Sequence, residues 1–218
     1  MSTLPTQYSS TLTEETLDLV ANTISQQGYI VLTDALPPGL VSSLLAKAVT
    51  HATHFKPAGI GRNQQHQLNN TIRTDRICWL SASNNAESAY LLEMEALRIA
   101  MNKRLFMGLF DYEAHFAHYP CDAFYKKHVD AFKGLTNRVL TTVFYLNSNW
   151  DKKDGGDLVI YDTNTGAPLH VNPKAGILVI FLSDEFPHEV KKVYKDRYSI
   201  AGWFRVNSSS LTKVDPEY

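Results

Sequence analysis

Residues 139–181 read VLTTVFYLNSNWDKKDGGDLVIYDTNTGAPLHVNPKAGILVIF, a series of short apolar runs separated by clusters of Asp, Asn, Gly and Lys. Short runs of β-branched and aromatic residues bounded by turn residues are typical of β-strands. The same pattern continues on both sides of this stretch. The expected strands are residues 112–119, 124–130, 139–147, 157–161, 176–181, 187–194 and 198–205.

The chain before residue 110 has a different pattern, in which apolar residues recur at helical spacing. Gly28 is placed to end the first helix, and Pro37 and Pro38 are placed to open the second. The expected helices are residues 14–27, 38 to about 51, and 86 to about 109, with short strands at 29–32 and 76–80. Thr11 and Glu14 are expected to form a capping box for the first helix.

These elements predict an α+β fold with a mainly β core, in which helices pack outside a β-sandwich or open barrel. We expect residues 1–110 to supply N-terminal helices, edge strands and a substrate loop packed on the same core. Residues 111–206 are expected to form that core, and 207–218 a C-terminal tail. A chain of 218 residues is long enough for one such domain.

The composition argues against several classes of function. A net charge of −1 gives no support for a polyanionic partner, so we expect no nucleic acid. Two cysteines, Cys78 and Cys121, are too few for a disulfide scaffold, and this favours a cytoplasmic location. We expect no membrane association either, because the N-terminus lacks a signal-peptide pattern and no apolar run is long enough to span a bilayer.

Residues 59–74, GIGRNQQHQLNNTIRT, form a long segment rich in Asn, Gln and Gly. Such a segment exceeds the usual length of a loop in a compact domain. It is either a mobile binding loop or disordered.

Four residues in the β half suggest a metal site. His128 and Asp130 lie two apart at the end of an expected strand, so their side chains can point to the same face. Alone, this pair could equally be a surface ion pair. His188 begins another expected strand, and Arg197 follows it by nine residues. Two imidazoles and one carboxylate on one face of an octahedral ion leave adjacent positions open, as in non-haem iron(II) oxygenases.

The open positions around such an ion suit a 2-oxo acid and dioxygen. The far carboxylate of a dicarboxylic oxo acid then needs a fixed cation. Arg197 suits that role because its planar guanidinium binds a carboxylate through two hydrogen bonds and keeps its charge.

The chain from Tyr119 to Arg205 resembles the prolyl hydroxylase branch of the 2-oxoglutarate oxygenases, which includes the hypoxia-inducible-factor prolyl hydroxylases and their bacterial relatives. The matching motifs agree in order and in spacing, except that the intervals near Tyr119, between Asp130 and Arg138, and before Gly155 differ by one residue from those of the animal enzymes. They are YP at 119–120, HVD at 128–130, YLNSNWD at 145–151, GGDL at 155–158, PHEV at 187–190 and RYSIAGWF at 197–204, with IRTDRICWL at 72–80 outside the core. Ala201 departs from the animal enzymes, which have a hydroxyl residue there.

This resemblance implies a distorted double-stranded β-helix of the jelly-roll or cupin type. It implies His128, Asp130 and His188 as catalytic metal ligands and Arg197 on the distal carboxylate of 2-oxoglutarate. Further residues are implied to bind the co-substrate: Tyr145, Tyr119, Leu158, Val190 and Trp203. The residues implied to bind the substrate are Arg138, Tyr125, Arg62, Arg73 and Arg76. Of these, Arg62, Arg73 and Arg76 belong to a substrate-covering loop at 59–76.

The resemblance also implies the reaction. Fe(II), 2-oxoglutarate and O2 would hydroxylate a prolyl residue of a protein and release succinate and CO2, with ascorbate as a reductant. Bacterial members suggest a Tu-type translation elongation factor as the substrate, and we expect a monomer. The alternatives are the same chemistry on another substrate, as in a nucleic-acid demethylase or another amino-acid hydroxylase, and a catalytically silent peptide-binding module.

Several of these residues also have structural interpretations. His115 and His118 are expected to be structural, because Tyr119 matches the family there. Gly155 and Gly156 are interpreted as a tight turn. Tyr145 could be a core aromatic residue, and Arg138 could be a solvated surface residue.

Overall fold

The computed structural model describes residues 10–59, 69, 71–131, 137–163 and 165–207. Arg62 and residues 208–218 of the expected tail lie outside this range. The helical elements are α1 (Glu14–Gln27), α2 (Pro38–Thr50), α3 (Asn85–Leu105) and the 3-10 turns η1 (Ala52–His54) and η3 (Lys152–Asp154). The strands are β1 (Tyr29–Leu32), β2 (Lys56–Pro57), β3 (Arg76–Trp79), β4 (Leu109–Tyr119), β5 (Tyr125–His128), β6 (Arg138–Tyr145), β7 (Leu158–Tyr161), β8 (Pro168–Val171), β9 (Leu178–Leu182), β10 (His188–Val190) and β11 (Arg197–Val206).

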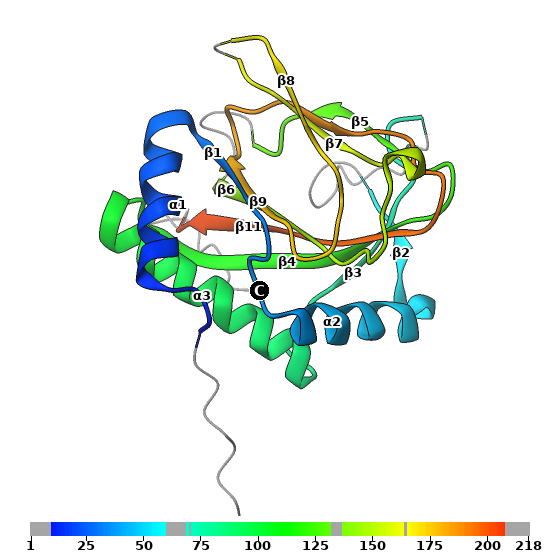
Figure 1. The fold of residues 1–218 in the computed structure, drawn as a ribbon, viewed down its shortest axis with the longest axis horizontal. Helices are drawn as coiled ribbons and strands as arrows, with labels where there is room; N and C mark the ends of the chain where they lie inside the picture. Colours follow the sequence, from blue (N-terminus) through cyan, green and yellow to red (C-terminus); the bar gives the residue numbers. More distant parts are fainter. Residues whose placement is uncertain (1–9, 60–68, 70, 132–136, 164, 208–218) are drawn as a thin grey trace, which may run out of the picture.

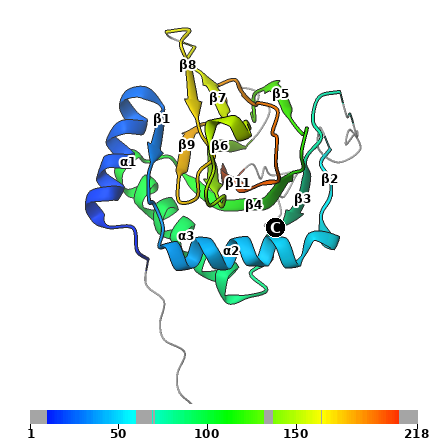
Figure 2. The same ribbon diagram turned by 45° about the vertical axis from the view of Figure 1, so that its right-hand side comes forward.

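Two antiparallel sheets form the core of the molecule, and Figures 1 and 2 show them facing each other. The major sheet has seven strands in the order β1-β9-β6-β11-β4-β3-β2, and the minor sheet has four in the order β5-β10-β7-β8. Two facing antiparallel sheets of this order form a distorted double-stranded β-helix, so the predicted fold class is confirmed. The division of the chain at residues 110 and 206 stays a prediction.

The three α-helices lie together on the outer face of the major sheet (Figure 1). Their buried residues, including Leu44, Met94 and Leu97, share one hydrophobic cluster with Phe144 and Phe204 of that face. A second cluster fills the space between the two sheets. None of the described helices is long and apolar enough to cross a membrane.

The ends of the helices follow their capping chemistry. The first helix ends at Gly28, which has the left-handed conformation expected (φ 79°). The capping box predicted at Thr11 and Glu14 is wrong, because Thr13 is the N-cap and its hydroxyl accepts from the Thr16 amide. The third helix ends at Leu105, short of the expected residue 109. There the side chain of Asn102 bonds both backbone groups of Leu109 and turns the chain.

The strands of the major sheet lie close to the expected ones, apart from the short β2, which was not predicted, and the other differences are in the minor sheet. β5 stops at His128 and β10 at Val190, both earlier than expected. Strand β8 was not predicted, because Pro168 at its start looks like a turn residue. Proline is tolerated there because β8 is the edge strand of its sheet.

Alternation along β11 separates the two faces of the major sheet. Ile200 and Phe204 point to the helices, whereas Arg197, Ser199 and Trp203 point to the other side, as period-two geometry requires. Gly202 lies on the helix face, where a Cβ atom would overlap the phenol of Tyr112. The space between the sheets is therefore lined by polar side chains of a central strand.

Candidate active site

Three side chains that can hold a metal ion converge between β5 and β10. His128 is the last residue of β5, and His188 is the first residue of β10 and pairs directly with it. Asp130 lies two residues beyond β5, in the turn that follows. One ligand atom of each residue lies within 4.8 Å of the others, and the group is largely buried.

The carboxylate of Asp130 lies between the two imidazoles. Its Oδ1 is 3.6 Å from Nε2 of His128, and its Oδ2 is 3.6 Å from Nε2 of His188. Tyr125 stacks on the ring of His128 at a centroid distance of 3.5 Å, and Phe181 contacts His188 edge-on at 4.8 Å. These aromatic contacts fix the planes of both imidazoles.

Backbone carbonyl groups set the tautomer of each histidine. Nδ1 of His128 lies 2.8 Å from the carbonyl oxygen of Lys126, and Nδ1 of His188 lies 2.9 Å from that of Phe186. A carbonyl oxygen can only accept, so Nδ1 carries the proton in each ring. Nε2 of each ring therefore faces Asp130, and the tautomer with the proton on Nδ1 presents a lone pair there, which is the arrangement of a metal-ligating histidine.

The charges of this group suit a cation. Burial lowers the pKa of His188 to about 4, so the ring is neutral at pH 7. Burial alone would raise the pKa of Asp130, but the adjacent imidazoles more than offset this and hold it well below its usual value. The hydroxyl of Thr141 also donates to Oδ2 of Asp130 at 2.9 Å. The Ser183 hydroxyl lies 2.9 Å from the Thr141 hydroxyl. The carboxylate is therefore ionised and oriented.

Arg197 is buried with most of its hydrogen-bonding capacity unused. It is 1% exposed, and its one hydrogen bond among the described residues runs from Nη1 to Ser199 at 3.4 Å. Its Nε and Nη2 atoms, and the Tyr145 hydroxyl, are buried with no hydrogen-bond partner in the described ranges. Its guanidinium lies 4.8 Å from the ring centre of Tyr119 and 5.0 Å from that of Tyr145.

A buried guanidinium whose N–H donors lack partners is energetically costly unless an anion binds to it. Burial raises the pKa of Tyr145 to about 12, with Arg197 acting in the opposite direction, so the phenol remains a donor at neutral pH. A carboxylate accepts bonds from both a guanidinium fork and a phenol. The residues therefore fit the distal carboxylate of 2-oxoglutarate, just as the His-Asp-His group fits Fe(II).

Gly156 makes room for this guanidinium. Its φ is 71°, and a Cβ atom here would lie 2.6 Å from Val193 and 3.0 Å from the Arg197 side chain. Gly155 also has a positive φ of 68°. The interpretation of this pair as a tight turn is therefore incomplete, because Gly156 also allows close approach of Arg197.

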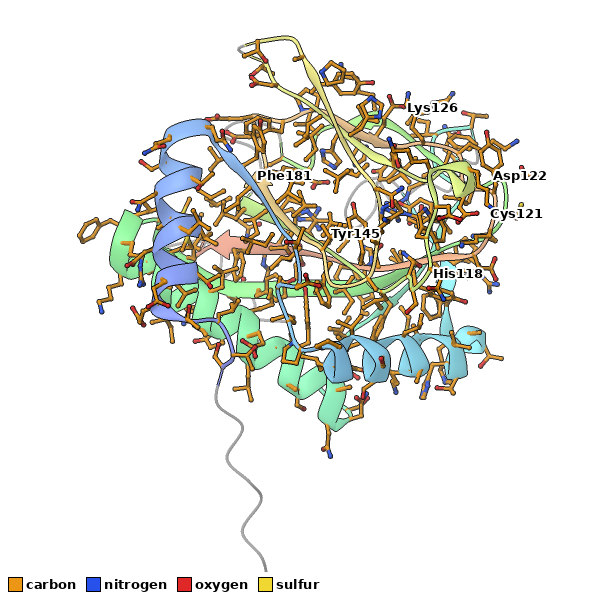
Figure 3. All side chains as sticks on the ribbon, viewed as in Figure 1. His118, Cys121, Asp122, Lys126, Tyr145 and Phe181 are labelled. Atoms are coloured by element: carbon orange, nitrogen blue, oxygen red, sulfur yellow. The ribbon has the colours of Figure 1, made fainter. Side chains whose placement is uncertain are left out.

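The other residues expected around the co-substrate fall into two places. Leu158, Val190, Tyr119 and Tyr145 belong to the cluster between the sheets, together with Phe181, and Figure 3 shows Tyr145 and Phe181 in this interior. Trp203 lies further along β11, opposite Thr141, which binds Asp130. Its indole N–H is also buried without a partner in the described part of the chain.

A second row of polar residues leads outward from His128. The guanidinium of Arg73 lies 4.2 Å above the ring of Tyr125 and donates from Nε and Nη2 to Asp75 at 2.7 and 2.6 Å. Asp75 is 2% exposed. Sequence reasoning named Arg73 and Tyr125 but missed Asp75, although the spacing of Arg73 and Asp75 places both on one face of an extended segment.

Arg138 is held in place and is not a solvated surface residue. It donates from Nε to Glu113 at 2.9 Å, and its guanidinium lies 3.6 Å above the indole of Trp203. Arg205 donates to the same carboxylate at 3.3 Å and to Asp111 at 2.8 Å. The contact between Glu113 and Arg205 was not predicted, because the two residues lie 92 residues apart and only the β4–β11 register brings them together.

Arg76 and His118 lie on the helix side of the major sheet, whereas His115 contacts Trp203 on the inner side. Arg76 is exposed, pairs with His118 across β3 and β4, and donates to the Phe55 carbonyl at 2.8 Å. The structure thus does not bring Arg76 to the metal group. His118 stacks on Tyr198 at a centroid distance of 4.5 Å, on the helix side. His115 is buried near Trp203, and burial lowers its pKa to about 4.

A double-stranded β-helix with a His-X-Asp…His group and a buried arginine on the last core strand defines a class, the iron(II)- and 2-oxoglutarate-dependent oxygenases. Residues 114–205 match the model of the 2OG-Fe(II) oxygenase superfamily. The chain belongs to this superfamily and, within it, to the prolyl hydroxylase family.

Two solved structures are similar to this chain. A Pseudomonas putida prolyl-4-hydroxylase is 38% identical, with the alignment covering 87% of this chain and 98% of that one at a TM-score of 0.81. A Trichoplax adhaerens prolyl hydroxylase, in complex with a peptide fragment of the hypoxia-inducible factor oxygen degradation domain, is 26% identical. That alignment covers 88% of this chain and 90% of the other, at a TM-score of 0.79.

A curated relative, the hypoxia-inducible factor prolyl hydroxylase of Caenorhabditis elegans, is 34% identical over 143 residues. The match covers 61% of this chain but 20% of that protein. This chain therefore corresponds to only a part of the longer relative.

Proposed function

We propose that this protein hydroxylates a prolyl residue of a protein substrate, with Fe(II) bound by His128, Asp130 and His188 and 2-oxoglutarate bound through Arg197. One observation carries the proposal. A preorganised His-Asp-His group and a buried arginine with unused donors share the space between the same two sheets. When bound, iron and 2-oxoglutarate would supply the oxygen chemistry, with succinate and CO2 as products.

The chain's own residues supply binding and orientation. The carbonyls of Lys126 and Phe186 keep the Nε2 lone pairs of both histidines toward the ion. Thr141 holds the Asp130 carboxylate, and Arg197 with Tyr145 would orient the co-substrate. The apolar side chains of Leu158, Val190 and Phe181 exclude water from its carbon chain.

The substrate would approach past Tyr125, Arg73 and Arg138: Tyr125 stacks on His128, Arg73 lies over Tyr125, and the charge of Arg138 acts on Asp130. Their positions are set by neighbours, since Asp75 holds Arg73 and Glu113 holds Arg138 over Trp203. An arginine held in one plane is suited to bind backbone carbonyl groups of an extended peptide. The peptide complex of the Trichoplax relative supports a protein substrate.

A Tu-type translation elongation factor is the first substrate to test, as in the bacterial relatives that this chain resembles. Ascorbate as a reductant and a cytoplasmic location stay predictions. Arg62 stays a predicted substrate residue. Arg76 is left out of this proposal, because it pairs with His118 on the helix side of the major sheet.

The experiment combines two readings on the purified protein with Fe(II), 2-oxoglutarate and O2. Succinate release measures co-substrate turnover, and mass spectrometry of the elongation factor and of cell-extract proteins measures the gain of one oxygen atom on proline. Arg138→Ala should reduce protein hydroxylation while leaving the affinity for 2-oxoglutarate unchanged.

Two results would contradict the proposal. Oxidation of methylated nucleic acid in preference to any protein would indicate a demethylase. Binding of iron and 2-oxoglutarate without succinate release, in the presence of extract proteins, would indicate a silent binding module.

A further inference from the structure

The side of α3 that faces away from the major sheet carries exposed apolar side chains in a row. Leu92, Ile99 and Phe106 lie seven residues apart and are 45%, 53% and 88% exposed. Ala96 falls between Leu92 and Ile99, and Ala89 lies three residues before Leu92. The resulting alternation of three- and four-residue steps is the pattern of a helix that packs along another helix. We call the residues Ala89, Leu92, Ala96, Ile99, Lys103 and Phe106 the α3 seam.

Phe106 combines exposure with an unfavourable backbone. It is the C-cap of α3 and has a left-handed conformation (φ 54°, ψ 36°), which glycine adopts without strain and bulky residues adopt at a cost. Its ring is left in water within a single copy of the chain. An aromatic side chain kept at such a position is better explained by contact with another molecule than by the stability of the monomer.

The charges beside the seam indicate what that molecule is. Glu95 and Lys103 lie four residues before and four residues after Ile99. If two α3 helices pack antiparallel about a two-fold axis near Ile99, Lys103 of each copy lies beside Glu95 of the other. A parallel pair would instead place like charges together. Lys103 is exposed and forms no ion pair within the described residues, and the Glu95 side chain is 47% exposed although it binds Arg98.

The same antiparallel arrangement matches large side chains with small ones. Phe106 of each copy reaches the end of the other helix that carries Ala89 and Leu92, and the alanines allow the two backbones to approach closely. The contact is isologous, so it closes after two copies. The metal group lies on the opposite side of the major sheet from the helices, so this contact leaves the candidate active site open (Figure 1).

We propose that this protein forms a homodimer through antiparallel contact of its α3 helices. A single helix pair is small compared with standard protein interfaces, so dissociation falls in the micromolar range. The monomer expected from the sequence stays a prediction, and it is the alternative that the experiment below distinguishes from the dimer.

Sedimentation velocity of the full chain, from about 1 to about 100 µM, tests the dimer directly. The wild type should move toward twice the monomer mass as concentration rises. Ile99→Glu should remain monomeric with an unchanged melting temperature, because Ile99 is exposed in one copy. The matched control is Tyr194→Glu, a 59% exposed aromatic residue between β10 and β11, which should dimerise like the wild type.

Charge exchange tests the antiparallel direction. Glu95→Lys and Lys103→Glu should each weaken association several-fold, and the double variant should restore it. Phe106→Gly should weaken association while raising the melting temperature of the monomer, since glycine relieves the left-handed strain. A wild type that stays monomeric over the whole range, a dimer that survives Ile99→Glu, or a double variant no better than the single ones would overturn the proposal.

Discussion

The two faces of the major sheet differ in how their buried polar groups are satisfied. On the helix side, the hydroxyls of Tyr90, Tyr112 and Thr142 are linked by hydrogen bonds. The Tyr90–Tyr112 distance is 2.9 Å and the Tyr112–Thr142 distance is 2.7 Å. On the inner side, Nε and Nη2 of Arg197, the Tyr145 hydroxyl and the Trp203 indole N–H are buried without partners among the described residues.

The unpartnered groups on the inner side are all donors. Buried polar groups in folded proteins normally have partners, so a concentration of unpaired donors indicates a site for an acceptor. Apart from Nε2 of His118, which lies 3.5 Å from Asp196 without a hydrogen bond, the helix face needs no ligand to satisfy its buried polar groups, whereas the inner face needs an anion. Substitutions on the helix face should therefore change stability, and substitutions on the inner face should change ligand binding.

The largest effect is expected for Asp130→Ala. Loss of the only carboxylate in the His-Asp-His group should lower the affinity for Fe(II) by on the order of 100-fold or more and abolish succinate production. Unfolding by urea should change little, since the substitution also removes a buried charge. The control is Asp122→Ala, an exposed acid paired with Lys192, which should keep full activity. Near-normal succinate production by Asp130→Ala would refute the metal site.

Sequence patterns predicted the repeating strands, the three helices and the His-Asp-His group well, because apolar periodicity and short spacings carry that information. They did not predict the partners of these residues. Thr141 is 11 residues from Asp130, Glu113 is 25 from Arg138, and Asp111 is 94 from Arg205. Such contacts depend on strand register, which the apolar pattern does not specify beyond which face a residue occupies.

On the helix face, a substitution should lower stability without changing the affinity for the co-substrate. Phe144→Ala removes a fully buried ring between β6 and the helices, and it should lower the free energy of unfolding by about 4 kcal/mol. The affinity of the remaining folded protein for 2-oxoglutarate should stay unchanged. Urea denaturation with co-substrate titration measures both quantities, and Leu19→Ala, at a 53% exposed position, should shift stability by no more than about 0.5 kcal/mol.

Arg197→Lys sharpens the comparison within the inner face. Lysine keeps the charge but loses the planar fork, so the dissociation constant for 2-oxoglutarate should rise more than about tenfold, or about 1.4 kcal/mol. Arg205→Lys is the control, because Arg205 lies on the same strand but is already bound by Asp111 and Glu113. Loss of affinity in Arg205→Lys alone would show that the co-substrate arginine has been misassigned.

Tyr145→Phe should have the smallest effect. Removal of one hydroxyl donor should weaken 2-oxoglutarate binding by about 1 kcal/mol, and it should raise the stability of the ligand-free protein because an unpartnered buried hydroxyl is lost. Calorimetric titration and thermal unfolding of the same preparation give the two values. Lower stability without co-substrate would mean that the hydroxyl has a partner in solution.

Thermal unfolding of wild type and Arg197→Met, with Fe(II) under anaerobic conditions and with or without 2-oxoglutarate, tests the central claim most directly. Methionine fills similar space without a buried charge, so the variant should melt at or above the temperature of the ligand-free wild type. 2-Oxoglutarate should raise the melting temperature of the wild type and leave that of the variant unchanged. A variant that melts lower without ligand, yet is still stabilised by 2-oxoglutarate, would contradict the account.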